Sequence, residues 1–292
     1  MSAAPATVAV NLLGFVEHPS FDGPSPWLLD VDGHPFVPTG DGGVVLGVRL
    51  GDPVGGTVGE QVVPGLTLVH PDAAARSALT ALSCVGNTLT VRTGAAAGLL
   101  GSVSGIRGES GRVIGVFDQE VLAMLRPGDQ VAVRAVGQGG APDGLDPSVA
   151  VLNAAPDLLG QLGVHVVPGG GVRARVAAVL PARAAGNGVG RPAHQWDVAL
   201  QSTDPAVGLR LGDLVAIDDL DVRHNVGFRH GWRTVGVVGS GASRQPGHGA
   251  GLTALVSGPA RLVGVEEVAG TPGLTEQILA ARRAAAVGTV TW

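Results

Sequence analysis

VRTGAAAGLLGSVSGIRGESGRVIGVFDQEVLAMLRPGDQVAVRAV, residues 91–136, is the stretch of sequence that decides the fold. Short runs rich in valine alternate in it with turns that contain glycine. The phrase Pro127-Gly-Asp-Gln-Val-Ala-Val-Arg is typical of a tight turn that leads into a strand. The stretch therefore predicts several short strands in close succession.

The glycine spacing of this stretch is similar to that of small SH3-like barrels. Towards the N-terminus, residues 27–37 predict a hairpin, because Asp32-Gly33 supplies a tight turn between apolar flanks. Residues 44–50 and 62–69 predict further strands. Residues 72–82 predict a helix that is capped by Asp72.

The Gly-Asp phrase at residues 128–129 recurs at residues 212–213 and, in weaker form, at 51–52. The recurrence favours two β modules, although such turns are common enough to recur by chance. We place the boundary between residues 140 and 170, which gives modules of residues 1–150 and 151–292. Strands are predicted in the second module at residues 173–180, 195–200, 215–217, 233–238 and 252–256, and helices at 155–162 and 275–286. The predicted fold class is α+β: β-rich, with two barrel-like β modules, the first SH3-like in part, and a few short helices.

All 19 basic residues are arginines, and the chain contains neither lysine nor tyrosine. A Walker A loop and a Schiff-base enzyme need lysine, and Tyr/Lys dehydrogenases need both residues. Those classes are excluded. The one cysteine excludes a disulfide framework, a Cys-rich zinc site and an iron–sulfur cluster carried by one subunit. We expect no organic cofactor, while a divalent metal stays open.

The net charge is −5, and the arginines are scattered along the chain without a basic run. This pattern argues against nucleic acid as a partner. The N-terminal MSAAPATVAVNLLGF lacks the basic region of a signal peptide. No apolar stretch approaches the ~18 residues that a membrane span needs. We therefore expect a cytoplasmic protein that binds neither nucleic acid nor membranes.

Cys84 follows the predicted helix and precedes a predicted strand. Its thiol could act as a nucleophile, with Asn87 or backbone amides holding an oxyanion and His70 acting as the base. The alternative is an inert buried thiol, because a helix C-terminus disfavours the thiolate and free cysteines are among the most buried residues. Both interpretations stay open.

Residues 218–230, DDLDVRHNVGFRH, contain three carboxylates and two histidines. Such side chains could bind a divalent cation. On a strand, Asp219 and Asp221 would share one face and could act as general acid and base. The alternative is a polar loop whose aspartates are neutralised by Arg223 and Arg229. The candidate metal ligands are Asp219, Asp221, His224 and His230.

Two matched phrases, Gly186-Asn-Gly-Val-Gly and Gly247-His-Gly-Ala-Gly, form the third candidate. The Gly-x-Gly-x-Gly spacing lets successive amides converge on an anion such as a carboxylate or phosphate. The alternative is a pair of plain tight turns. With His248 in one phrase, the two loops are the best pocket candidate in the sequence. The predicted substrate-binding residues are Gly186, Asn187, Gly188, Gly190, Arg229, Gly247, Gly249 and Asn87.

Several phrases occur in the order of one family along most of the chain. They are Gly51-Asp-Pro, Cys84-Val-Gly-Asn, Gly137-Gln-Gly, Asn153-Ala-Ala-Pro-Asp-Leu-Leu, Leu162-Gly, Gly186-Asn-Gly-Val-Gly, Gly212-Asp-Leu-Val, Asp219-Leu-Asp and Gly247-His-Gly-Ala-Gly. Together they resemble the uncharacterised domain-of-unknown-function family 4438. The resemblance implies an α+β fold rich in β-barrel and a homo-oligomer, and it implies no reaction. Residues 222–230 depart from the family pattern, which puts a shared chemistry in doubt there.

Two functions are consistent with these residues. The first is an enzyme that acts on a small polar or anionic substrate, a hydrolase or cyclase at a carbon–nitrogen bond. The glycine loops would bind the anion, and the proton-transferring residues would be Asp219, Asp221, His224 and His248, with Cys84 added in a covalent version. The second is a non-catalytic small-molecule-binding or oligomeric assembly protein.

Overall fold

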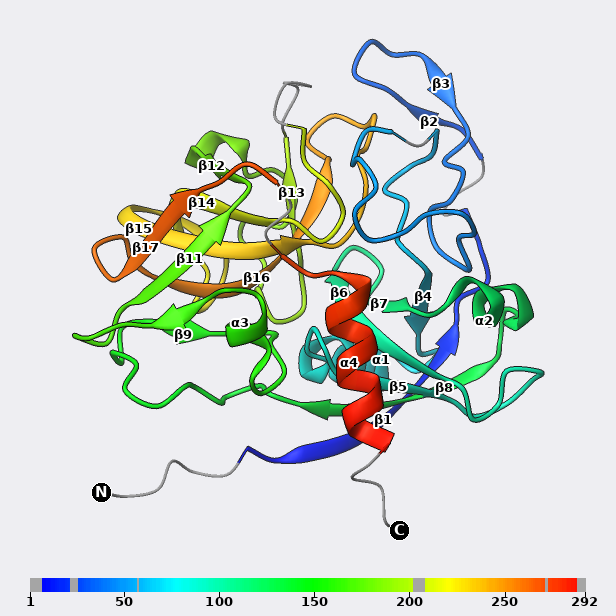
Figure 1. The fold of residues 1–292 in the computed structure, drawn as a ribbon. Helices are drawn as coiled ribbons and strands as arrows, with labels where there is room; N and C mark the ends of the chain where they lie inside the picture. Colours follow the sequence, from blue (N-terminus) through cyan, green and yellow to red (C-terminus); the bar gives the residue numbers. More distant parts are fainter. Residues whose placement is uncertain (1–6, 22–25, 57, 202–207, 271–272, 288–292) are drawn as a thin grey trace.

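The structure is a computed structural model that describes residues 7–21, 26–56, 58–201, 208–270 and 273–287. Strands dominate and the helices are few and short, which confirms the prediction of a β-rich α+β chain. Figure 1 shows two β-rich halves, and the N-terminal half contains a closed barrel. Within the described residues, no helix is long and apolar enough to cross a membrane.

The barrel has six strands in the order β1-β4-β7-β6-β5-β8. Every neighbouring pair is antiparallel. The valine-rich runs of residues 91–136 form three of these strands, and their buried side chains, such as Val103, Val113 and Val133, fill the interior. The strands are β1 Ala9–Val16, β4 Leu66–Val69, β5 Thr88–Val91, β6 Leu100–Arg107, β7 Arg112–Val116 and β8 Gln130–Val136.

The recurring Gly-Asp phrase is one turn, Arg-x-Gly-Asp, that is built three times, at residues 49–52, 126–129 and 210–213. In each copy an aspartate oxygen accepts the arginine backbone N–H at 2.8 Å. Each glycine has a φ between 89° and 95°, which glycine adopts without strain. The first and third copies lie side by side, because the Gly51 N–H donates to the Leu211 carbonyl oxygen at 2.8 Å.

The C-terminal half is built on a sheet of order β12-β14-β15-β16-β13, with β9 paired to β16. A three-stranded sheet, β10-β11-β17, lies beside it. The predicted strands within residues 195–256 are confirmed, and β14, β15 and β16 are longer than predicted. The bounds are β9 Ala150–Val151, β10 His165–Val166, β11 Val172–Val176, β12 Ala178–Leu180, β13 Val198–Leu200, β14 Leu214–Asp221, β15 Gly227–Val238, β16 Ala250–Pro259 and β17 Val263–Glu267.

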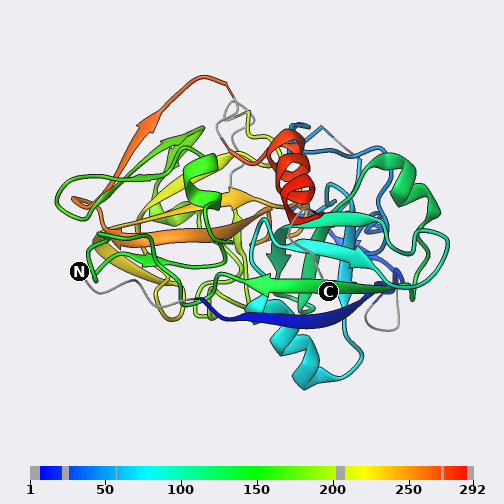
Figure 2. The same ribbon diagram turned by 60° about the horizontal axis from the view of Figure 1, so that its bottom comes forward.

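The helices are α1 Ala73–Leu82, α2 Gln119–Met124, α3 Leu158–Gln161 and α4 Glu276–Val287. Asp72 caps α1 as predicted, because its Oδ1 accepts the Ala75 N–H at 2.8 Å. In both views α4 lies where the two halves meet (Figures 1 and 2). Arg282 of α4 donates to the carbonyl oxygens of Gly86 and Pro156, one from each half. Helix α4 therefore fastens the barrel to the second half.

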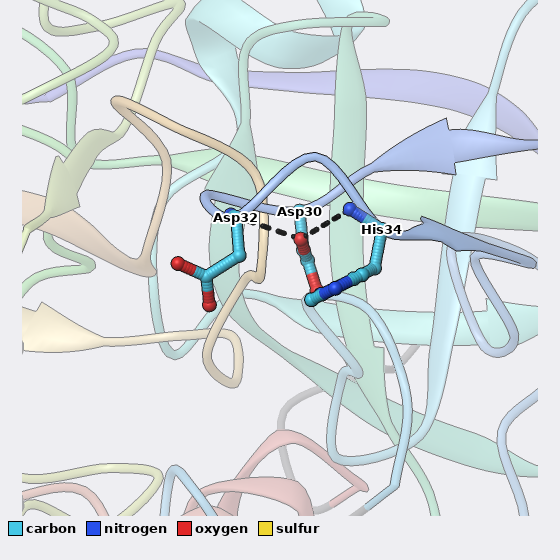
Figure 3. Close-up of side chains that lie close together, drawn as sticks. All are labelled: Asp30, Asp32 and His34. Carbon is cyan, nitrogen blue, oxygen red and sulfur yellow. Dashed lines mark hydrogen bonds and ion pairs between the residues drawn. The ribbon is translucent and has the colours of Figure 1, made fainter.

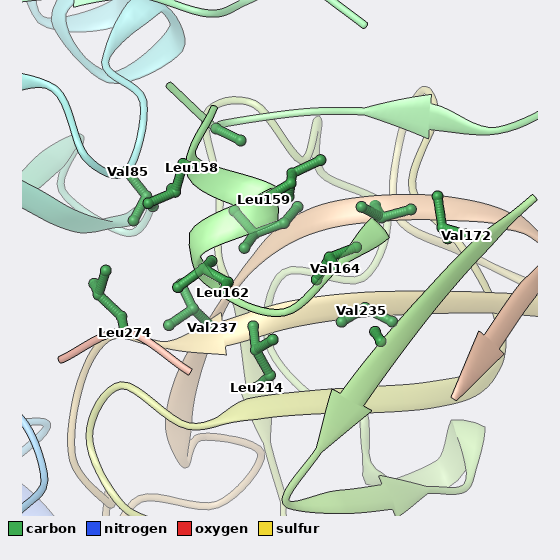
Figure 4. Close-up of a cluster of buried hydrophobic side chains, with 14 of the residues drawn as sticks. Val85, Leu158, Leu159, Leu162, Val164, Val172, Leu214, Val235, Val237 and Leu274 are labelled. Atoms are coloured by element: carbon green, nitrogen blue, oxygen red, sulfur yellow. The ribbon is translucent and has the colours of Figure 1, made fainter. Parts of the chain in front are cut away.

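The main core of the second half lies between its two sheets and α3 (Figure 4). Leu158 and Leu162 of α3 pack there with Val237 of β15 and Leu214 of β14. Val85, from the segment between α1 and β5, joins the same cluster. Because this core receives residues from both halves, the predicted module boundary at residue 150 stays a prediction.

Three local predictions are corrected. Residues 44–50 form no strand, since only Val44 makes a β-bridge and Gly47 adopts a φ of 80° that breaks an extended chain. Of the strand predicted at 62–69, only the part that forms β4 is a strand. The strand predicted at 173–180 is divided into β11 and β12, which pair with different partners. The predicted hairpin at 27–37 is confirmed as β2 Leu28–Leu29 and β3 Pro35–Phe36.

Candidate functional site

The two glycine phrases lie against each other, as the pocket prediction required. The Asn187 N–H donates to the Gly247 carbonyl oxygen at 2.8 Å. A side chain at Gly186 would overlap that same carbonyl, and one at Gly188 would overlap the carbonyl of Asp197. The backbones can therefore approach this closely because both positions are glycine.

His248 and Asn187 are joined through their side chains. Asn187 Nδ2 lies 3.1 Å from His248 Nε2, and Glu109 Oε1 lies 3.3 Å from the same nitrogen. His248 Nδ1 lies 3.1 Å from the Pro246 carbonyl oxygen. Glu109 comes from the turn between β6 and β7, so the barrel supplies one member of the pair. The side chains of His248 and Glu109 are 20% and 47% exposed, so the pair can be reached from solvent.

Asp197 is the buried acid of the same site. Its Oδ1 accepts the Gly108 N–H at 2.9 Å, and its other oxygen lies over Gly251 beside the Ser240 hydroxyl. Asp197, Glu109 and Asn187 line one cavity of about 10 Å³, which has room for about one water-sized group. The other residues of the lining are Gln61, Arg107, Trp196 and Ala199.

Burial and hydrogen bonding shift the pKa values of the three titratable groups apart. The hydrogen bond that Glu109 accepts from His248 raises the pKa of His248 above its ordinary value, and the same bond lowers the pKa of Glu109. Burial raises the pKa of Asp197, against the opposing effect of the Gly108 N–H. The site therefore combines a His–Glu pair whose hydrogen bond favours the charged form of each partner with a carboxyl group whose pKa is raised by burial.

We expect His248 to titrate above pH 6.5 and its pKa to fall when Glu109 is replaced by glutamine, because Glu109 is the largest cause of the shift. Stability from a raised histidine pKa is fully present below pH 6.5 and is lost as the pH rises through the folded-state pKa. NMR of the imidazole protons across pH measures the shift, with Arg134→Gln as control. An unchanged His248 titration in Glu109→Gln would contradict the assigned cause.

Behind the cavity lies a buried ion-pair network that anchors the β6–β7 turn. Arg107 Nη1 donates to Asp41 at 2.6 Å and its Nη2 donates to Gln61 at 2.7 Å. Arg112 donates to both carboxylate oxygens of Glu17 and, at 3.0 Å, to Asp41. Burial opposes the charge of Arg112, but these carboxylates raise its pKa on balance. Both arginines are therefore committed to carboxylates of the protein.

The amides of the first glycine loop are also committed. From Gly186 to Arg191 every backbone N–H donates within the protein, to the carbonyl oxygens of Ala199, Gly247, Gly186, Val226 and Gly188 and to the Asn187 side chain. The loop is thus a rigid support for Asn187. Its predicted role as an anion-binding nest would need these bonds to break.

The aspartates of residues 218–230 lie on the β14–β15 hairpin and bond to neighbouring basic residues. Asp221 accepts from Arg223 at 2.9 Å and from Arg229 at 3.2 Å. Burial opposes the charge of Asp221, but these hydrogen bonds lower its pKa on balance. Asp219, at a bulge with a φ of 58°, accepts the Gly231 N–H and lies 3.3 Å from His230. His224 is exposed on the same hairpin. This arrangement matches the polar-loop alternative.

Cys84 is fully buried, and burial raises its pKa to about 12. Its Sγ lies 3.8 Å from the Leu82 carbonyl oxygen. Asn87 holds the local backbone, because its Oδ1 accepts the Cys84 N–H and its Nδ2 donates to Val136. A thiol with this pKa is protonated at neutral pH, which favours the inert interpretation.

Asp30, Asp32 and His34 form a second cluster of possible metal ligands, on the exposed β2–β3 hairpin (Figure 3). Asp30 Oδ1 accepts the backbone N–H groups of Asp32 and His34 at 3.0 and 2.8 Å. This bonding pattern is that of a side chain stabilising a tight turn. The same contacts lower the pKa of Asp30.

A cavity of about 670 Å³ lies elsewhere. It opens between the loop that follows β8, strand β9 and helix α3, and apolar side chains such as Val151, Leu159 and Val164 line it together with Asp157 and Gln161. It shares no lining residue with the cavity at Asp197.

The sequence analysis named Asn187 and His248 as candidates, and it gave no indication of Glu109 and Asp197. Both missed residues lie in ordinary turn sequences, Gly-Glu-Ser-Gly and Gln-Trp-Asp, that carry no motif. Only tertiary packing brings Glu109 and Asp197 to the site, because the β6–β7 turn of the barrel is inserted between loops of the other half.

The chain matches a family described as "Domain of unknown function (DUF4438), N-terminal" over residues 27–160 and its C-terminal counterpart over residues 161–271. Comparison with curated proteins found no match. The solved structure described as "Crystal structure of TM1086" is similar, with a TM-score of 0.87 and 32% identity over 91% of this chain and 95% of that chain. Its description names no activity.

Proposed function

This chain belongs to the DUF4438 family, and we propose that it is an acid–base enzyme for a small polar or anionic substrate. The reaction is hydrolysis or cyclisation at a carbon–nitrogen bond. One observation carries the proposal: Glu109, which pairs with His248, lines one small cavity together with Asp197, whose pKa is raised by burial. Titratable groups whose environments separate their pKa values are characteristic of acid–base sites.

We propose the following role for each group in hydrolysis. Neutral His248 takes a proton from water as the water oxygen adds to the carbonyl carbon, and Glu109 stabilises the imidazolium that forms. The His248 imidazolium then gives its proton to the nitrogen as the carbon–nitrogen bond breaks, and Asp197 hydrogen-bonds the water-sized group that its cavity holds. In cyclisation a nucleophilic group of the substrate takes the place of water. Asp219 and Asp221 are left out of this mechanism, because arginine and histidine already pair with them.

The test is turnover of a panel of small amides, lactams and ureido compounds that carry a carboxylate. Turnover is measured as the formation of ammonia or of a free amino group. We expect wild-type activity to rise with pH through the pKa of His248, since only neutral imidazole accepts a proton. His248→Gln and Glu109→Gln should each lose at least about tenfold in kcat. Arg134→Gln, an exposed barrel substitution, should keep full activity.

The enzyme proposal would be contradicted if wild-type protein formed no more product than the His248→Gln variant with any compound of the panel. That result would favour a second candidate, a non-catalytic small-molecule-binding protein. The cavity of about 670 Å³ supports this candidate, because its size lies in the range of ligand pockets and its lining is mostly apolar with a few polar groups.

A further inference from the structure

We infer that Arg191, whose guanidinium stacks on the Trp196 ring beside the Asp197 cavity, recognises a carboxylate of the substrate. The inference rests on the proposed function for its location and adds the residue and the chemical group that select the substrate. A substrate anion needs a cation near the cavity that is not already paired with a carboxylate of the protein.

Three positive groups at the cavity, Arg107, Arg112 and His248, already have carboxylate partners. Arg107 and Arg112 are bound to Asp41 and Glu17, with side chains only 2% and 6% exposed. His248 pairs with Glu109. The N–H groups of residues 186–191 all donate within the protein. A substrate anion therefore needs a different donor.

Arg191 is exposed, and its guanidinium lies over the ring of Trp196, 4.8 Å from the ring centroid. Trp196 in turn lines the cavity. Its indole packs against Gly108 and Gly188, the residues beside Glu109 and Asn187. Arg191 thus lies on the outer face of the aromatic side chain that separates solvent from the site.

The backbone of Arg191 is fixed, because its N–H donates to Gly188 at 3.0 Å and its carbonyl oxygen accepts from Val226 at 2.8 Å. Among the described residues, no carboxylate forms an ion pair with its guanidinium. Stacking on an indole orients the planar group and leaves its edge N–H donors free.

These features select a carboxylate. A guanidinium edge binds the two oxygens of a carboxylate through two parallel hydrogen bonds. One arginine balances one negative charge, whereas a phosphate dianion would keep an unbalanced charge near Glu109. The substrate class is therefore a small amide or lactam that carries a carboxylate.

The test is an NMR titration with sodium acetate at constant ionic strength, following the indole N–H of Trp196, which a Trp196→Phe spectrum assigns. Wild-type protein should show a saturable shift. Arg191→Gln should weaken acetate binding at least tenfold, while the matched Arg134→Gln should bind as wild type does. Inorganic phosphate should bind more weakly than acetate.

Equal acetate binding by wild type and Arg191→Gln would overturn the inference, and so would phosphate binding more tightly than acetate. His248→Gln should still bind acetate, which separates this inference from the reaction. If acetate binding depends on Arg191 while no compound is turned over, the carboxylate site stands and the proposed enzyme fails.

Discussion

Replacing Arg112 with methionine should lower the free energy of unfolding by about 3–5 kcal/mol, the range for breaking a buried ion pair. Arg112 donates to both carboxylate oxygens of Glu17, and the two side chains are 6% and 9% exposed. Without the guanidinium, the Glu17 carboxylate keeps the Thr67 hydroxyl, which donates to it at 2.6 Å, as its one side-chain donor among the described residues. Most of the expected loss is the cost of leaving that carboxylate buried without a counter-charge.

Urea unfolding followed by circular dichroism measures the loss. The double variant Arg112→Met/Glu17→Leu removes the buried charge together with its partner, so it should recover much of the stability. Arg134→Met, at an exposed arginine on β8, should change stability by less than about 0.5 kcal/mol. A loss in Arg112→Met no larger than that of Arg134→Met would show that the pair does not contribute as its burial implies.

The second large effect is expected at Gly212, with Gly51 as its matched control. Both are the third residue of an Arg-Leu-Gly-Asp turn, and both have a φ of 95°. Alanine at either position pays the same conformational cost, about 1–2 kcal/mol. At Gly51 the new Cβ would meet nothing within 4 Å, whereas at Gly212 it would overlap the Leu274 carbonyl oxygen.

Gly212→Ala should therefore lose about 1–3 kcal/mol more than Gly51→Ala, the usual cost of overpacking. Denaturant unfolding of the two variants under the same conditions gives the difference directly. Because tetrapeptide and φ are the same, the difference isolates the close approach of the segment before α4. Equal losses would mean that the Leu274 segment moves aside at no cost.

Much of the fold could be predicted because it is written in local sequence. The Arg-x-Gly-Asp turns are set by a glycine and by an aspartate that bonds three residues back, so the same letters give the same turn each time. Residues 44–50 show where local reasoning ends. Their valines are typical of a strand, yet a glycine with positive φ divides them, and no pattern rule shows which glycine adopts it.

The candidate site was predictable only in part, for a related reason. The glycine phrases indicated Asn187 and His248, because close backbone approach requires glycine. Glu109 lies 139 residues from His248, and only tertiary packing brings the two together. Asp221, by contrast, attracted attention through local charge density, and partners two and eight residues away neutralise it. Closely spaced charges of residues 218–230 thus pair with one another. The charges that meet at the candidate site are isolated in the sequence.

The closure of the barrel sets the order in which this protein can fold. Strand β1 pairs with β8 along its length, from Ala9 with Val136 to Phe15 with Gln130. The first strand must therefore wait for its partner until residues up to 136 have left the ribosome. Contacts between such distant segments form slowly, because the chain loses the entropy of a long loop before the pairing stabilises it. Until then, the edge of β1 that pairs with β8 stays unpaired.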